Sequence, residues 1–369
     1  MPTIEDVRSD YFRIPLPVPL SDSTHGLIPN FELIVVRVRD ADGAEGVGYT
    51  YTAGRNGRAI LAVASEIAEL ARGKDADLSE SLWNSIWWAL HYGGRGGPTV
   101  CALSAFDMAI WDLKSKRAKA PLWRMLGGFD QKVPVYAGGV DLEFSVDRLL
   151  KQAEGFLAKG FRAIKMKVGR KNLAEDVERV SAMRKRLGDG FPLMVDANMK
   201  WSVDEAVRAA RALAPFNPGW LEEPTIPDDI AGHARIASEG GLPIATGENM
   251  RTIWEFQQMI TIGRVTFPEP DVTNCGGITP FMKIAHLAEA HNLPVTSHGA
   301  HDVAVHLLAA VPNRSYLEAH GFGLESFLAQ PLEIQGGFAI APERPGHGIE
   351  FDWEKLATFG ELGAAYRSQ

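Results

Sequence analysis

The sequence predicts an α/β protein in which a (β/α)8-type barrel follows a small α+β domain. Short strand-like runs alternate with helical patterns between residues 129 and 325, which is the signature of a parallel barrel. Several of these runs end in charged side chains. Glu222 follows Asp196 by 26 residues, and Glu248 follows Glu222 by 26 residues. One strand and its returning helix occupy about that much chain, so each unit delivers a charged side chain to the same rim.

The first 128 residues are expected to form the smaller domain. Strand patterns come first and helical patterns second, in one block, which favours an α+β arrangement. The expected strands cover 31–40 and 46–54, and the expected helices cover 59–73, 80–94 and 99–118.

The pattern changes to strand–helix alternation at about residue 129. The run 133–139 reads as a strand, and 143–160 reads as an amphipathic helix that ends at Gly160. A doubly wound sheet is the alternative, but an open sheet gathers its site at one switch point and does not explain charges at nearly every strand end. The segment 326–369 returns to loop and strand character and is expected to pack back on the first domain.

Composition narrows the range of partners and compartments. The net charge of −8 disfavours nucleic acids and anionic membranes, since both reward a basic face. The chain has two cysteines, Cys101 and Cys275, too few for a disulfide framework. The acidic N-terminus does not resemble a signal peptide, and no run is apolar for long enough to span a bilayer. A cytoplasmic protein is expected.

The three carboxylates with matched spacing predict a metal site. Asp196, Glu222 and Glu248 are expected to converge at one rim of the barrel. Hard oxygen ligands without a cysteine or a pair of histidines favour Mg²⁺. Taken singly, each acid could instead be a helix cap or a solvated loop charge. Asn198 shares the strand face of Asp196 and is expected to orient a ligand.

Two lysines are expected to face the same site. Lys165 and Lys167 are two residues apart on a strand, so their side chains share a face. Two neighbouring ammonium groups depress each other's pKa, and a lysine lowered in this way can act as a general base. The alternative is a solvated strand end.

A histidine and two acids complete the predicted rim. His298 ends the seventh strand and Asp271 ends the sixth, so a carboxylate–imidazole pair is expected there. Glu318 ends the eighth strand and is either a protonated hydrogen-bond donor to a substrate or a rim charge. His301 and His320 are further, weaker candidates. These groups suit removal of a proton next to a carboxylate, with a metal stabilising the charge that develops.

These motifs resemble the enolase superfamily, and within it the mandelate racemase subgroup. The resemblance implies a (β/α)7β barrel with a capping domain that the C-terminal segment completes, and a symmetric homo-oligomer, often an octamer. It also implies one Mg²⁺ on Asp196, Glu222 and Glu248, and Lys167 as a base in the Lys165/Lys167 pair. The implied acid–base partners are His298 with Asp271, and Glu318.

The capping domain is expected to select the substrate through loops at 15–30 and 49–57. These segments carry polar side chains, among them His25, Tyr51 and Arg55, and polar loops suit a polyhydroxylated small-molecule carboxylate. Dehydration of an aldonate or aldarate, such as galactarate or talarate, to a 2-keto-3-deoxy acid is therefore favoured. The alternatives are a racemase or epimerase of a 2-hydroxy acid, and a catalytically silent metal-binding scaffold.

Overall fold

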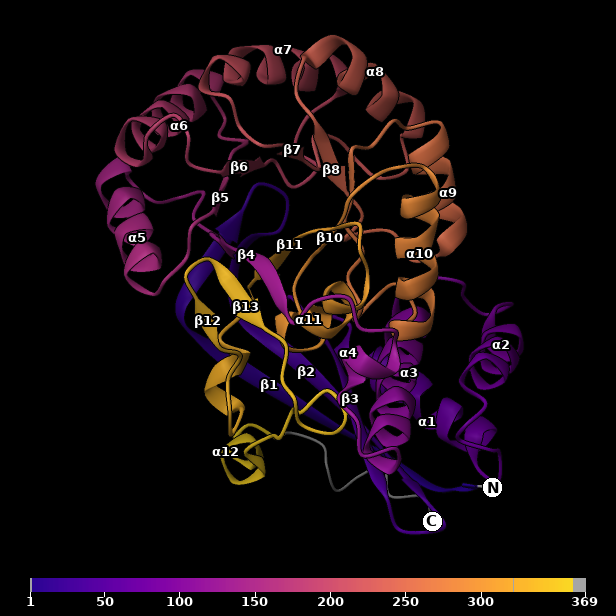
Figure 1. Ribbon diagram of the computed structural model, residues 1–369. Helices are drawn as coiled ribbons and strands as arrows, with labels where there is room; N and C mark the ends of the chain where they lie inside the picture. The colour runs from indigo at the N-terminus through magenta and orange to yellow at the C-terminus, as the bar shows by residue number, and fades with distance from the viewer. Residues whose placement is uncertain (1, 321, 361–369) are drawn as a thin grey trace.

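The computed structural model describes residues 2–320 and 322–360, which form a barrel and a smaller domain lying against it (Figure 1). Residues 361–369 of the predicted C-terminal segment lie outside the described residues. In the part of the chain that is described, no helix has the length and apolar character needed to cross a membrane.

The smaller domain, called the capping domain below, is a three-stranded antiparallel sheet covered by helices. The strands are in the order β1-β2-β3. The elements are β1 (Ile4–Asp22), β2 (Gly26–Asp40), β3 (Glu45–Thr52), α1 (Gly57–Ala71), α2 (Ser79–Leu90), α3 (Pro98–Arg117) and the short α4 (Leu122–Met125).

Two glycines allow α3 to lie directly on the sheet. A Cβ atom on Gly46 would fall 2.1 Å from the carbonyl oxygen of Ala109, and one on Gly48 would fall 2.1 Å from that of Ala105. Since these neighbours are helix backbone, any side chain at either position would push the helix away. The pair therefore fixes the distance between β3 and α3.

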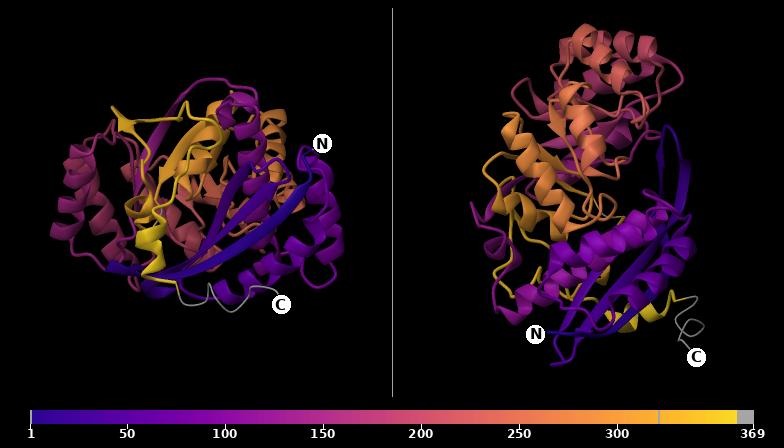
Figure 2. Two further views of the ribbon diagram at one scale, coloured as in Figure 1. Left: turned by 90° about the horizontal axis from the view of Figure 1, so that it is seen from below. Right: turned by 90° about the vertical axis from the view of Figure 1, so that its right-hand side faces the viewer.

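The predicted loop at 15–30 is wrong, because this segment is the end of a long β-hairpin. β1 runs to Asp22, β2 starts at Gly26, and Ser21 pairs with Leu27 across them. The run of prolines between residues 15 and 19 breaks the strand signal, but β1 is an edge strand and its register shifts between Pro15 and Leu20. Edge strands and irregular positions are where a proline can be accommodated in a sheet. In the right-hand view of Figure 2 the indigo hairpin rises from the capping domain along the barrel.

The barrel has eight parallel strands and seven intervening helices among the described residues, so the predicted (β/α)7β architecture with a capping domain is confirmed. The strands are β4 (Lys132–Gly138), β5 (Ile164–Lys167), β6 (Leu193–Asp196), β7 (Leu221–Glu222), β8 (Ile244–Thr246), β9 (Phe267–Pro268), β10 (Val295–Ser297) and β11 (Arg314–Ala319). The helices are α5 (Val146–Ala158), α6 (Leu173–Leu187), α7 (Val203–Leu213), α8 (Ile230–Gly240), α9 (Ile253–Thr261), α10 (Ile278–Ala290) and α11 (His301–Ala310).

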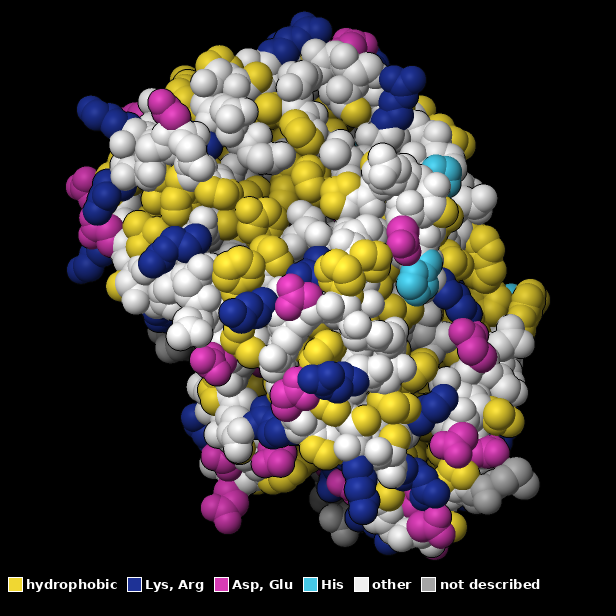
Figure 3. Space-filling model, viewed as in Figure 1, with side chains coloured by type: hydrophobic (Ala, Val, Ile, Leu, Met, Phe, Trp, Pro, Cys, Tyr) yellow, Lys and Arg dark blue, Asp and Glu magenta, His cyan; other side chains and the backbone are white. Residues whose placement is uncertain are grey.

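Apolar side chains fill the inside of the barrel below its charged rim. Tyr136, Met194 and Trp220 form a buried cluster with small residues of neighbouring strands. In the space-filling view, hydrophobic side chains gather inside the ring of helices, over β5–β8 (Figure 3). Strand register then sets the level of the rim, because Lys167 pairs with Asp196 and Asp196 pairs with Glu222.

The C-terminal segment contacts both domains. β12 (Ile334–Gln335) and β13 (Phe338–Ile340) form a hairpin, and β13 pairs antiparallel with β4. The chain then crosses to the capping domain, where the ring of Phe351 packs edge-on against Tyr49. The helix α12 (Trp353–Ala357) follows, shortly before the end of the described residues.

A buried histidine lies where α11, α4 and the C-terminal segment meet. His306 accepts a hydrogen bond at Nδ1 from the Trp123 backbone N–H (3.3 Å), and its Nε2 donates to the His347 carbonyl (3.0 Å). Burial, followed by the nearby His347, lowers the pKa of His306 to about 3. The imidazole is therefore neutral in the folded protein.

We expect this histidine to make the protein less stable in acid. The unfolded chain binds a proton at His306 near pH 6.5, whereas the folded chain does so only near pH 3. The free energy of unfolding therefore falls as the pH is lowered from about 6.5 towards 3. In thermal melts at a series of pH values, His306→Gln should flatten this decline, and the exposed-site control His286→Gln should not. An unchanged slope for His306→Gln would contradict the assignment.

Candidate metal and acid–base site

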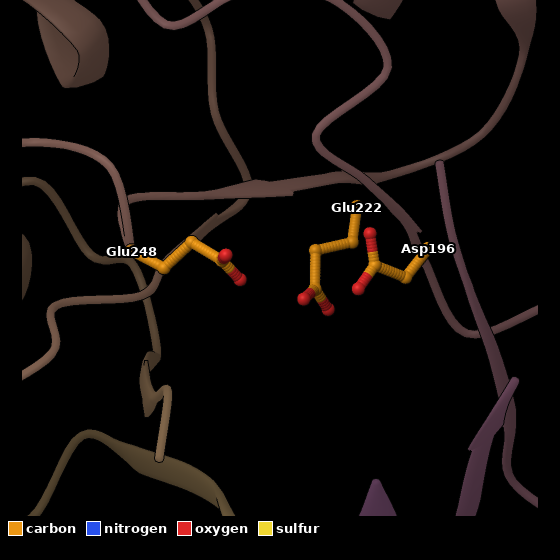
Figure 4. A group of neighbouring side chains, drawn as sticks. All are labelled: Asp196, Glu222 and Glu248. Carbon is orange, nitrogen blue, oxygen red and sulfur yellow. The ribbon is translucent and has the colours of Figure 1, made fainter. Parts of the chain in front are cut away.

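Three carboxylates converge at the rim as the sequence predicts. Asp196 and Glu222 end the neighbouring strands β6 and β7, and Glu248 follows β8. One carboxylate oxygen of each lies within 4.8 Å of those of the other two. Figure 4 shows the three side chains pointing towards a common space. Asp196 and Glu222 are fully buried, whereas Glu248 is partly exposed.

The chemistry of this group fits a hard divalent cation. Burial, then Asp196, then Glu269 raise the pKa of Glu222 well above its usual range, because negative charges are crowded where water cannot screen them. Within the described residues, Asn198 Oδ1 is buried and makes no hydrogen bond. An all-oxygen donor set with a spare acceptor suits Mg²⁺, which keeps positions open for other oxygen ligands. The residues present can therefore hold the predicted metal.

The two lysines face the carboxylates, but the predicted lowering of their pKa is wrong for this arrangement. Lys165 pairs with Glu222 and with Glu318 (2.8 Å), and Lys167 pairs with Asp196 (2.5 Å). Burial lowers the pKa of both lysines, but the attraction of these carboxylates outweighs it and raises the pKa of each above its usual range. Spacing along the strand showed that the lysines are neighbours, but not which charges lie opposite them.

His298 and Asp271 form the predicted pair. His298 Nδ1 lies 2.8 Å from Asp271 Oδ2, and Nε2 lies 3.2 Å from Glu248 Oε2. Asp271 also accepts hydrogen bonds from Tyr51 Oη (3.1 Å) and from the backbone and side chain of Thr273. Burial lowers the pKa of His298, but Glu248, then Glu318 and Asp271, raise it to about 10. The ring is therefore a cation at neutral pH and carries a proton to donate.

Glu318 corresponds to neither of the two predicted forms. It is buried, with 2% of its surface exposed, so it is not a solvated rim charge. Burial raises its pKa, but Lys165 and His298 outweigh that effect and hold the pKa below its usual range, so the carboxyl is ionised rather than protonated. Its Oε2 accepts the Gly299 backbone N–H at 3.0 Å. Glu318 therefore links the lysine pair to the histidine pair.

A cavity of about 590 Å³ opens onto this rim, and both domains line it. Of the acid–base and metal candidates, Lys167, Glu248, Asp271, His298 and Glu318 border the cavity. The other three candidates are buried beneath the cavity wall and contact the residues that border it: Lys165, Asp196 and Glu222.

The four predicted substrate-contacting residues all border the same cavity. His25 lies at the hairpin tip, Tyr51 ends β3, Arg55 follows it, and Asn198 follows β6. The His25 imidazole Nδ1 lies 2.9 Å from Asp22 Oδ2, and this bond raises the pKa of His25. The hairpin tip is tied to the barrel, since Ser23 Oγ donates to the Ala197 carbonyl (2.6 Å) and Thr24 Oγ1 donates to that of Asn198.

The structure adds acidic residues that the sequence reasoning missed. Glu223 is buried beside Glu222 with a φ of 39° and accepts bonds from Asn249 Nδ2 to both carboxylate oxygens (2.9 and 3.1 Å). Glu269 is buried and accepts the Tyr136 hydroxyl (3.0 Å). Glu269 directly follows β9, two residues before Asp271, and this position beyond a strand end was a usable signal. The third acidic residue that was missed is Asp141, which lies three positions beyond the end of β4.

Comparisons with known proteins match both domains of the chain. Residues 7–127 match a family model described as the N-terminal domain of mandelate racemase / muconate lactonizing enzyme. Residues 148–355 match one described as enolase C-terminal domain-like. The chain is 58% identical over 354 residues to a 3,6-anhydro-alpha-L-galactonate cycloisomerase of Streptomyces coelicolor, covering 96% of this chain and 98% of that protein.

Solved structures of similar proteins contain magnesium. A racemase from Streptomyces coelicolor with bound magnesium has a TM-score of 0.95 and 56% identity, and the match covers 97% of this chain and all of that one. L-talarate/galactarate dehydratase from Salmonella typhimurium, liganded with Mg and L-lyxarohydroxamate, has a TM-score of 0.93 and 36% identity, with 98% and 93% covered. Magnesium is therefore the metal of these similar proteins, and the carboxylate triad of this chain can hold it.

We expect the triad to determine magnesium affinity. Glu222→Gln removes one anionic ligand. Calorimetric titration with Mg²⁺ should therefore show binding weakened by about tenfold or more, because mutating even a residue that only hydrogen-bonds to a metal ligand typically weakens binding by that factor. Asp112→Asn is the matched control, because Asp112 is also a fully buried acid but lies on α3 of the capping domain, where it accepts the Val47 backbone N–H, and the affinity of this variant should stay within about threefold of the unmodified protein. Unchanged affinity in Glu222→Gln would remove this residue from the metal site.

Proposed function

Because the chain belongs to the mandelate racemase/muconate lactonizing enzyme family of the enolase superfamily, we propose that it acts on a sugar acid. It removes the proton next to the carboxylate and breaks the carbon–oxygen bond one carbon further along. The observation that carries this proposal is that Lys167 and the His298–Asp271 pair border one cavity together with Glu248. A base and an acid are thus held around a site for a carboxylate.

Lys167 is the base in this proposal. Of the two lysines, it is the one that borders the cavity, whereas Lys165 is bound between Glu222 and Glu318. A divalent cation on the triad would stabilise negative charge on the substrate carboxylate and offset the carboxylate charge that raises the lysine pKa. Lys165 supplies a fixed positive charge beside the base, which disfavours protonation of Lys167.

His298 is the acid that protonates the departing oxygen. Its imidazolium form is stabilised by Glu248, Glu318 and Asp271, and Asp271 holds the ring through Nδ1, so Nε2 is the nitrogen that faces the reaction. Proton delivery of this kind contributes about 10²- to 10⁴-fold to a rate.

The departing oxygen decides the class of reaction. In a 3,6-anhydro sugar acid, O3 belongs to a ring ether. Lys167 takes the C2 proton, the C3–O bond breaks, and His298 protonates the oxygen to leave a hydroxyl on C6. The enol then becomes a 2-keto-3-deoxy acid and no atom is lost, which makes the reaction an isomerisation. The 58% identity to a cycloisomerase of such a compound favours this version.

Dehydration, which the sequence reasoning favoured, is the second candidate. The same two residues would expel a free C3 hydroxyl as water, and the 36% identity to a talarate/galactarate dehydratase supports it. In either case the polar cavity wall, with His25, Tyr51 and Arg55, suits a polyhydroxylated substrate because hydroxyls need partners when they leave water.

A substrate panel tests the proposal. The protein is incubated with Mg²⁺ and 3,6-anhydro-L-galactonate, galactarate, L-talarate or mandelate, and keto acid is detected with semicarbazide. We expect keto acid from the anhydro acid, and keto acid from galactarate or talarate alone would identify a dehydratase. In D₂O, exchange at the α-carbon without keto acid would identify a racemase or epimerase instead. Magnesium binding with neither keto acid nor exchange would overturn the proposal and leave a silent scaffold.

The two acid–base residues should be separable by mutation. Lys167→Ala and His298→Asn should each lower kcat by about 10²- to 10⁴-fold, while magnesium affinity in a calorimetric titration stays within about tenfold. His301→Asn is the control, since His301 lies three residues beyond His298 and bonds the His320 carbonyl, and it should keep kcat within about threefold. Full activity in Lys167→Ala would exclude this lysine as the base.

A further inference from the structure

β4 is too short to form backbone hydrogen bonds with Lys167, the last residue of β5. The Gly139 backbone N–H donates to the Lys165 carbonyl at 2.9 Å, which is the last ordinary bond between these neighbouring strands. In a parallel sheet, the next bonds from β4 would engage the N–H and the carbonyl of Lys167. The chain has already turned away at Val140, so no strand backbone reaches them.

Two side chains occupy the place of the missing strand. The Lys167 N–H donates to Asp141 Oδ1 (3.0 Å), and Arg179 Nη1 on α6 donates to the Lys167 carbonyl (2.7 Å). Arg179 Nη2 also donates to the Asp141 carbonyl (2.9 Å) and lies 3.4 Å from Asp141 Oδ1. Both backbone polar groups of Lys167 are therefore held by one ion pair.

A second acid extends this ion pair along the same loop. Asp176 Oδ2 accepts the backbone N–H groups of Gly169 and Arg170, each at 3.0 Å, and its Oδ1 lies 3.8 Å from Arg179 Nη1. Asp141, Asp176 and Arg179 are all buried, with at most 4% of each residue exposed. Placing three charges away from water is costly unless they bind one another, and here they do so around the end of β5.

We infer that Asp141 and Arg179, supported by Asp176, are positioning residues for Lys167. They fix the backbone from which the lysine side chain extends, and so set where its Nζ meets the substrate. The inference rests on the proposed function in taking Lys167 as the base. A displacement of about 1 Å at a reacting group can cost about 10²-fold in rate, so this fixation is large enough to matter.

The same network connects the base to the capping hairpin. Asp141 forms a parallel β-bridge with Ser21, next to Asp22, which holds His25. Asp141 thus contacts both Lys167 and the hairpin that carries His25, and it holds the hairpin together with the bonds that Ser23 and Thr24 make to the barrel.

The test compares two arginines of α6. Arg179→Met removes the bonds to Lys167. Arg184→Met is the matched control, since Arg184 is buried on the same helix and donates to the carbonyls of Gly188, Phe191, Phe216 and Asn217, at the other end of α6. The variants are assayed below their melting temperatures. We expect Arg179→Met to lower kcat by about 10- to 100-fold relative to the unmodified protein, while its KM stays within about threefold. Arg184→Met should keep both constants within about threefold, and Arg179→Lys should recover part of the lost kcat.

A measurement without substrate separates this inference from the proposed function. Hydrogen exchange followed by mass spectrometry on the peptide 164–172 reports the amides of Lys167, Gly169 and Arg170. Exchange should speed up in Arg179→Met and Asp141→Ala but not in Arg184→Met. If no substrate is turned over, the proposed function fails, but hydrogen exchange still tests whether Asp141 and Arg179 hold the backbone of Lys167. Unchanged exchange, or faster exchange with kcat preserved, would overturn the positioning role.

Discussion

The site depends on the balance of charge at a rim from which water is excluded. Asp196, Glu222 and Glu318 are buried acids, and Lys165 forms an ion pair with each of them. Such a group is stable only if each charge has an opposite neighbour at bonding distance. The strand register brings the partners together. Glu248 and Asp271 raise the number of these acids to five, against two lysines and one imidazolium, and a divalent cation on the carboxylate triad would supply the two positive charges that balance them. The apolar layer below and the capping domain above keep water from screening these interactions.

This balance explains why the cavity is divided between two domains. The barrel supplies the proposed acid–base groups, each at the end of a strand or just after it, where backbone hydrogen bonds limit its freedom. The capping domain supplies the proposed substrate contacts His25, Tyr51 and Arg55, from the hairpin tip, from β3 and from the turn after it. Tyr51 belongs to both sets, because its hydroxyl also donates to Asp271. In the proposed function, substrate recognition and acid–base chemistry therefore meet at the carboxylate of Asp271.

The sequence was sufficient for the fold and for the residues that converge, because both follow from periodicity. The 26-residue spacing places Asp196, Glu222 and Glu248 on successive strands, whatever the details of packing. It was not sufficient where a property depends on what lies opposite a residue. The pKa of Lys167 is set by Asp196 across the sheet, and Arg179 replaces a strand that spacing would have assumed to continue. The hairpin at 15–30 was missed because the cost of a proline depends on whether its strand lies at an edge.

The glycine pair that seats α3 on the sheet has a mechanical consequence. Gly26 at the hairpin tip lies ten residues before Val36, the partner of Gly48, a span of about 33 Å in an extended strand. A small rotation of the sheet about the contact between β3 and α3 is therefore amplified into a larger displacement of His25. A rotation of about 5° at this contact would carry the tip about 3 Å over that length. Packing at the far end of the capping domain therefore acts on the position of His25, together with the bonds that tie the hairpin tip to the barrel.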